Sequence, residues 1–71
     1  MTPASLKRIG SCLYGPNWQT PLGAALGVTA RTIRRWAVGH TGMPAMIGDE
    51  LEKLAILRRR EIEKMLAREF A

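Results

Sequence analysis

The sequence predicts a small all-α domain of four to five helices, with a central helix-turn-helix and a long C-terminal helix. Three observations favour this class. At 71 residues the chain has room for a single small hydrophobic core. Apolar residues recur three and four positions apart, which lines them up on one face of a helix. Threonine–proline pairs and glycines separate the apolar runs and supply helix start and stop signals.

The first predicted helix begins at Thr2 and Pro3. Threonine can cap free backbone amides, and proline costs little at the first helical position because an N–H there has no partner. Leu6, Ile9 and Leu13 form its apolar stripe. The glycine and proline in residues 14–17, YGPN, then end the helix.

Four further side chains in residues 1–18 could have either a structural or a binding role, and the structural role or solvation is expected for each. Lys7 and Arg8 lie away from the apolar stripe, so we expect them to be solvated, with phosphate contact as the alternative. Cys12 stands at the edge of the stripe and is expected to be inert packing. Trp18, between two helix starts, is expected to be a core wedge rather than a stacking platform for bases.

The second predicted helix starts at Thr20 and Pro21, with threonine as the cap and proline as the first helical residue. Its apolar face consists of Leu22, Ala25 and Leu26. Gly27 is expected to end it, because glycine tolerates the left-handed backbone that redirects the chain. Val28 would then fold back over the apolar stripe.

The third predicted helix, capped by Thr29, has two unlike sides. At about 100° per residue one side is apolar and the other carries guanidinium groups. The apolar side holds Ile33, Trp36 and Ala37, and the opposite side holds Arg31, Arg34, Arg35 and Val38. A charged face is most often merely solvated, but arginine also matches phosphate oxygens and the O6/N7 edge of guanine.

Gly39 is expected to end this helix, and residues 40–44 form a loop by composition. His40 is the single histidine of the chain. Cys12 is the only other side chain that could serve as a soft metal ligand, so His40 cannot complete the four ligands of a structural zinc site, and no metal is expected. Solvation is the expected state of His40, and phosphate contact is the alternative.

From Pro44 onward a helical apolar sector reaches almost to the C-terminus. Its members are Ile47, Leu51, Leu54, Ala55, Ile62, Met65 and Leu66. Asp49 and Glu52 have the spacing of a capping box, which leaves open whether this region is one helix or two. The part from residue 47 to residue 54 should close the core over Ile33 and Trp36.

Residues 58–71 are predicted to form a helical extension beyond the domain of residues 1–57. A continuous helix from Asp49 to Phe70 would be ~33 Å long, comparable to the diameter of the whole domain. Part of it should therefore project and leave its apolar stripe uncovered. A second copy of the chain is the simplest cover, through Ile62, Met65, Leu66 and Phe70. For residues 58–60, RRR, we favour a solvated or interface role over DNA contact.

The charge of the chain is unevenly distributed. The net charge is +5, residues 1–48 contain no Asp or Glu, and residues 49–71 contain six acidic and six basic residues. A basic half attracts a polyanion, and double-stranded DNA is the commonest one that a helix-turn-helix fits. RNA, acidic protein and anionic membrane would feel the same attraction, so charge alone does not choose among them. The lone cysteine suits a reducing interior, and no signal peptide or apolar span of about 18 residues is apparent, so a cytoplasmic, soluble protein is expected.

Residues 19–38, QTPLGAALGVTARTIRRWAV, resemble the helix-turn-helix of the lambda-repressor-like (phage-repressor or Cro-type) family. The family pattern has Gln first, a small residue fifth, Gly ninth, an aliphatic residue fifteenth and often Trp eighteenth. Gln19, Gly23, Gly27, Ile33 and Trp36 stand at these positions. Gly23 departs from the usual alanine, and glycine weakens a helix by roughly 0.5–1 kcal/mol relative to alanine.

The resemblance implies a regulator that places its second motif helix in the major groove. Gln19 and Thr20 would hold the DNA backbone. Base or phosphate contacts would come from Thr29, Ala30, Arg31, Thr32, Arg34 and Arg35. A dimer would bind an inverted repeat with half-sites about one turn, ~34 Å, apart, and family members often repress phage or mobile-element operons, including their own.

The alternative is a protein-interaction module, such as an antitoxin or adaptor, whose amphipathic C-terminal helix docks into another protein. Neither interpretation implies catalysis or a cofactor. The sequence has no Cys/His dyad at meaningful spacing and no phosphate-cradling glycine loop, and its carboxylates are confined to the last third.

Overall fold

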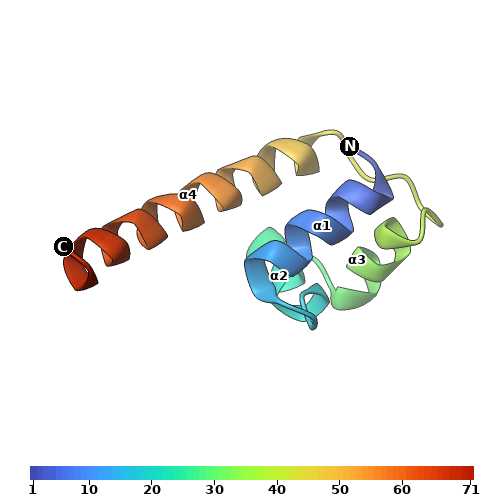
Figure 1. The fold of residues 1–71 in the computed structure, drawn as a ribbon. Coiled ribbons are helices and arrows are strands. Elements are labelled where there is room, and N and C mark those ends of the chain that lie inside the picture. Colours follow the sequence, from blue (N-terminus) through green and yellow to red (C-terminus); the bar gives the residue numbers. More distant parts are fainter.

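The computed structural model describes residues 1–71 and contains four helices and no strand, which confirms the all-α prediction. The helices are α1 (Pro3–Tyr14), α2 (Gln19–Leu26), α3 (Ala30–Ala37) and α4 (Met46–Glu69). The first three pack together, and α4 leaves them and carries the C-terminus far to one side (Figure 1). The molecule is therefore elongated, with extents of 46 × 22 × 20 Å.

The predicted start and stop of α1 are confirmed. Thr2 Oγ1 accepts a hydrogen bond from the Ser5 N–H at 3.1 Å, and Pro3 is the first helical residue. After Tyr14 the chain turns at Gly15, which has a φ of 81°.

The predicted start of α2 is wrong. The helix begins at Gln19, and Trp18 occupies the cap position without a side-chain hydrogen bond. The Trp18 backbone is already helical, and its carbonyl accepts from Leu22 N–H at 3.0 Å. Thr20 therefore lies inside the first turn and caps nothing. Pro21 is tolerated there because the amides of the first turn have no helical partner.

The turn between α2 and α3 follows the prediction. Gly27 adopts the left-handed conformation, with φ 74° and ψ 27°. Its N–H donates to the Ala24 carbonyl at 3.4 Å, and the Val28 N–H donates to the Gly23 carbonyl at 2.9 Å. These two bonds form a Schellman motif, which satisfies carbonyls that the end of a helix otherwise leaves free. Thr29 then caps α3.

The core lies where α1, α2, α3 and the first turns of α4 meet. Its buried members are Leu6, Trp18, Leu22, Ile33, Trp36, Ala37, Ile47 and Leu51. The predicted burial of Trp18 is thus confirmed. A Cβ at Gly10 would overlap the indole of Trp18, so glycine lets the indole lie directly on the α1 backbone.

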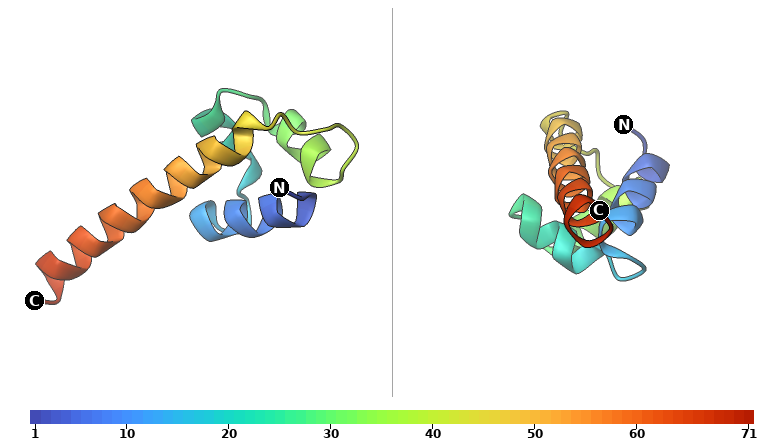
Figure 2. Two further views of the ribbon diagram at one scale, coloured as in Figure 1. Left: turned by 90° about the horizontal axis from the view of Figure 1, so that it is seen from above. Right: turned by 60° about the vertical axis from the view of Figure 1, so that its left-hand side comes forward.

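The C-terminal region is one continuous helix of 24 residues. It begins at Met46 rather than Pro44, and the interruption that the spacing of Asp49 and Glu52 left open does not occur. Asp49 instead lies in its first turn, where a carboxylate is favoured by the positive end of the helix dipole. The helix buries Ile47 and Leu51, as predicted, and then runs past the core into solvent (Figure 2).

A contact between α1 and α4 fixes the point at which α4 leaves the core. Arg58 Nη1 donates to the Leu13 carbonyl at 3.0 Å, and its guanidinium lies 5.5 Å from the centre of the Tyr14 ring. The side chain thus binds the carbonyl end of α1, where a cation is favoured. Arg58 has an intramolecular role, while Arg59 and Arg60 are exposed.

Cys12 is exposed on α1, so its expected role as packing at the stripe edge is wrong. At this end of α1 Leu13 is buried, while the neighbouring Cys12 is exposed. None of the four helices combines the length and apolar character needed to cross a bilayer.

Candidate nucleic-acid interface

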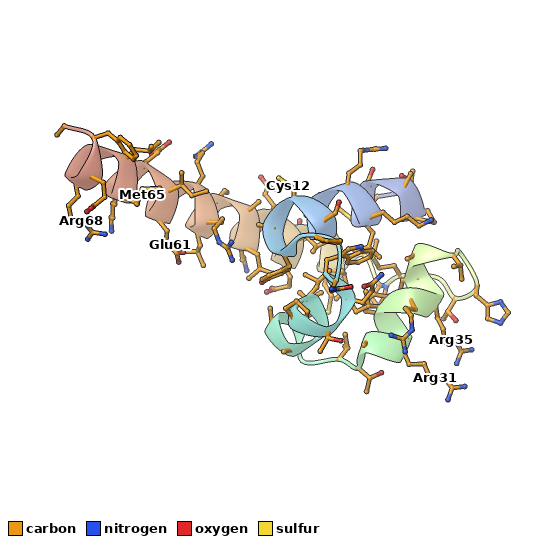
Figure 3. The ribbon with its side chains drawn as sticks, turned by 60° about the horizontal axis from the view of Figure 1, so that its bottom comes forward. Cys12, Arg31, Arg35, Glu61, Met65 and Arg68 are labelled. Atoms are coloured by element: carbon orange, nitrogen blue, oxygen red, sulfur yellow. The ribbon has the colours of Figure 1, made fainter.

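The exposed side of α3 carries the three arginines that the sequence places together. Ile33, Trp36 and Ala37 are buried beneath this helix, which confirms its predicted two-sided character. Arg31 and Arg35 lie one turn apart and point away from the body of the molecule (Figure 3). The apolar side anchors the helix, so these guanidiniums are displayed from a fixed support.

Residues at the start of α3 hold its first turn together. Thr29 Oγ1 accepts from the Thr32 N–H at 3.2 Å, and the two threonine hydroxyls lie 3.0 Å apart. Ala30 is half-buried between them in the chain. Thr29 and Arg31 are exposed in this turn, and Thr32 is half-buried.

A basic pocket opens where α1, the start of α2 and α3 meet. Its volume is about 420 Å³. The lining residues are Lys7, Arg8, Ser11, Trp18, Gln19, Arg34, Ala37 and Val38. Three cations from two helices thus surround one hollow beside Gln19. Arg34 lines this pocket, unlike Arg31 and Arg35, which are absent from its walls.

Lys7 and Arg8 are exposed, as expected, and both also line this pocket. The sequence shows that Lys7 and Ser11 lie one turn apart and therefore share a side of α1. It does not show that this side faces Arg34, because that depends on how α1 packs against α3.

The cations around α1 and α3 have no acidic partners. Every ion pair in the structure lies within α4: Lys53–Glu50, Arg58–Glu61, Arg59–Glu63 and Arg68–Glu69. Arg8 donates only to the Ser5 hydroxyl, at 3.2 Å. The positive charge at this surface is therefore left uncompensated by the protein itself.

Two other predicted contact residues lie outside the pocket. Thr20 is exposed in the first turn of α2, next to Gln19. His40 follows α3, and its backbone N–H donates to the Arg35 carbonyl at 3.0 Å, while its side chain is exposed. The residues predicted for dimerisation, Ile62, Met65, Leu66 and Phe70, are all exposed at the projecting end of the chain.

No protein-family model, curated protein or solved structure matches this chain. No group of three or more His, Cys, Asp or Glu side chains is placed to hold a metal ion. What the surface gathers is cations, amides and hydroxyls, the groups that bind phosphate and the edges of bases.

Proposed function

We propose that this protein is a sequence-specific double-stranded-DNA-binding regulator, and that α2, the glycine turn and α3 form a DNA-reading helix-turn-helix. The observation that carries the proposal is the face of α3 with Arg31, Arg34 and Arg35, which is backed by buried Ile33 and Trp36. An α-helix of this kind fits the major groove of B-DNA. The protein is proposed to bind an inverted repeat as a dimer and to repress transcription there.

The geometry supports a division of labour among the three arginines. Arg31 and Arg35 project freely and are proposed to reach base edges, where a bidentate guanidinium prefers guanine. Arg34 lines the basic pocket with Lys7 and Arg8 and is proposed to grip a backbone phosphate there. Gln19 lines the same pocket and would fix the register of the domain on the duplex.

The experiment is a binding series on duplex DNA, first with sites selected from a random pool and then with single variants. Arg31→Ala or Arg35→Ala should cost about 1–3 kcal/mol on the selected site and relax the preference at one base pair. Arg34→Ala or Lys7→Ala should weaken selected and random duplexes alike, and lower the slope of log K against log salt by about 1. Arg60→Ala, on exposed α4, is the matched control and should leave both quantities unchanged.

The proposal fails if the wild-type protein binds duplex DNA without steep salt dependence, or if the triple alanine variant of the α3 arginines binds its selected site normally. A protein-interaction module is the second candidate, and the exposed apolar residues of α4 favour it. Such a module would bind its partner through α4 and would show no salt-dependent affinity for random duplex DNA.

A further inference from the structure

We infer that a second copy of this chain covers the projecting half of α4, in an antiparallel pairing whose two-fold axis passes near Ile62. This inference gives the proposed dimer a defined face and orientation. It depends on none of the DNA contacts proposed above, so it stands or fails separately from them.

The surface to be covered is a continuation of the face that closes the core. Ile62, Met65, Leu66 and Phe70 expose 45%, 37%, 47% and 76% of their surfaces. Together they present on the order of 400 Å² of mostly apolar area, which is within the size range of the largest apolar patches on monomers, and such patches are often functional. At about 100° per residue, Ala55, Ile62 and Leu66 fall within about 40° of one another, so they form one stripe.

Beside this stripe lies an apolar groove between α1 and α4. It has a volume of about 270 Å³ and is lined by Cys12, Leu13, Ala55, Arg58, Arg59, Ile62 and Glu63. A second hollow of about 220 Å³ adjoins it and shares Cys12, Leu13 and Ala55. The groove thus begins where α1 ends and leads directly onto the exposed stripe.

The groove and the exposed apolar residues lie at opposite ends of the projecting segment, so an antiparallel partner would place one on the other. Ala55 lies seven residues before Ile62, and Glu69 lies seven residues after it. Both intervals are about 10 Å long. A copy reversed about Ile62 therefore lays its segment 66–70 along the groove beside Ala55, and the same contact is repeated on the other side, as two-fold symmetry requires. A parallel copy would instead set groove against groove and leave both unfilled.

The charge of α4 permits a second copy as the occupant, and the same helix carries both the groove and the apolar segment that would fill it. The six acidic residues of the chain and six of its basic residues all lie within α4, so this helix is neutral, and the +5 net charge resides in the rest of the chain. Two copies that meet through α4 bring neutral helices into contact, and the +5 charge of each copy stays away from the contact. The basic surfaces of α1 and α3 then remain uncovered.

The interface is small, and this sets its expected strength. The exposed stripes of both copies and their grooves amount to roughly 1,000 Å², the low end of specific protein interfaces. We therefore expect monomers at about 1 µM and dimers as the concentration approaches about 1 mM.

Sedimentation equilibrium of the full chain without DNA tests the pairing. The wild-type mass should rise from one chain to two over this concentration range. Ile62→Glu should shift the midpoint at least about tenfold upward, because the pairing would bury its charge. Leu57→Glu is the matched control: Leu57 is 54% exposed on the same helix, about 160° away from the stripe, and should keep the wild-type midpoint. Circular dichroism checks that both variants keep their helices.

Cysteine cross-linking tests the orientation. In a Cys12→Ser background, Ile62→Cys should oxidise to a disulfide-linked dimer, because residue 62 meets its own copy at the axis, and Leu57→Cys should not. Phe70→Cys should also fail, since an antiparallel copy keeps the two Phe70 positions apart, whereas a parallel copy would join them. A monomer at every concentration, equal effects of the Ile62 and Leu57 glutamate variants, or cross-linking through Phe70→Cys would each overturn the proposal.

Discussion

Gly23 offers a sharp test of how closely α2 approaches the start of α3. It is buried, and a Cβ added to it would lie 2.7 Å from the Val28 carbonyl oxygen and 3.3 Å from the Ala30 nitrogen. Both neighbours are backbone atoms of the turn, so neither can rotate away as a side chain would. Gly23→Ala must therefore displace the turn or the helix.

Two opposing effects set the size of the change. Alanine gains about 0.5–1 kcal/mol over glycine within a helix. Forcing a methyl group into a packed site costs about 1–3 kcal/mol. We expect a net loss of about 1–2 kcal/mol, because the atoms that would collide belong to the backbone. For a chain of this size that lowers Tm by about 4–16 °C.

Thermal unfolding followed by circular dichroism measures the effect. Gly42→Ala is the matched control, because Gly42 has no positive φ and a Cβ added to it would meet no heavy atom within 4 Å. It should leave Tm unchanged or raise it slightly. If Gly23→Ala melts at or above the wild-type temperature, the close approach of α2 to the turn is wrong. The outcome also bears on the resemblance, since the lambda-repressor-like pattern has alanine at this position.

Two further predictions concern caps at helix ends. Thr29→Ala removes the oxygen that accepts from Thr32 N–H and should lower the free energy of unfolding by about 0.5–2 kcal/mol, measured by urea denaturation. A loss below about 0.3 kcal/mol would show that the cap is not formed in solution. Arg58→Gln removes the charged contact with the Leu13 carbonyl and the Tyr14 ring, so amides of residues 59–69 should exchange with solvent faster in a hydrogen-exchange experiment. Arg60→Gln is its control, and equal exchange in the two variants would contradict the anchoring role of Arg58.

Charge is distributed differently in α4 and in the rest of the molecule, and this affects which partners each part can attract. All ion pairs lie within α4, and three of them join opposite charges three or four residues apart, which neutralise one another. The cations of α1 and α3 lack such partners. One part of the chain is thus suited to attract a polyanion, and the other to associate with a neutral apolar surface.

Local signals in the sequence were sufficient for α1, the glycine turn and the two sides of α3. The Thr2 and Thr29 caps depend on a hydroxyl and an amide three residues apart, and the left-handed turn depends on Gly27 alone. The same local reasoning failed at Thr20, because a threonine–proline pair also fits inside a first turn. In the structure Trp18 is buried at the cap position of α2, and the helix starts at Gln19 instead of Pro21.

The helical class, the amphipathic faces and the excess of positive charge before residue 49 followed from the amino-acid sequence alone, because each is a property of residue type and of spacing within about one turn. The packing of the helices was needed to establish that Lys7 and Arg8 face Arg34, that Arg58 binds the end of α1, and that Cys12 borders an apolar groove. These are relations between helices far apart in the chain. They depend on how the core side chains fit together. The periodicity of apolar residues along one helix does not determine the angle at which the next helix packs against it.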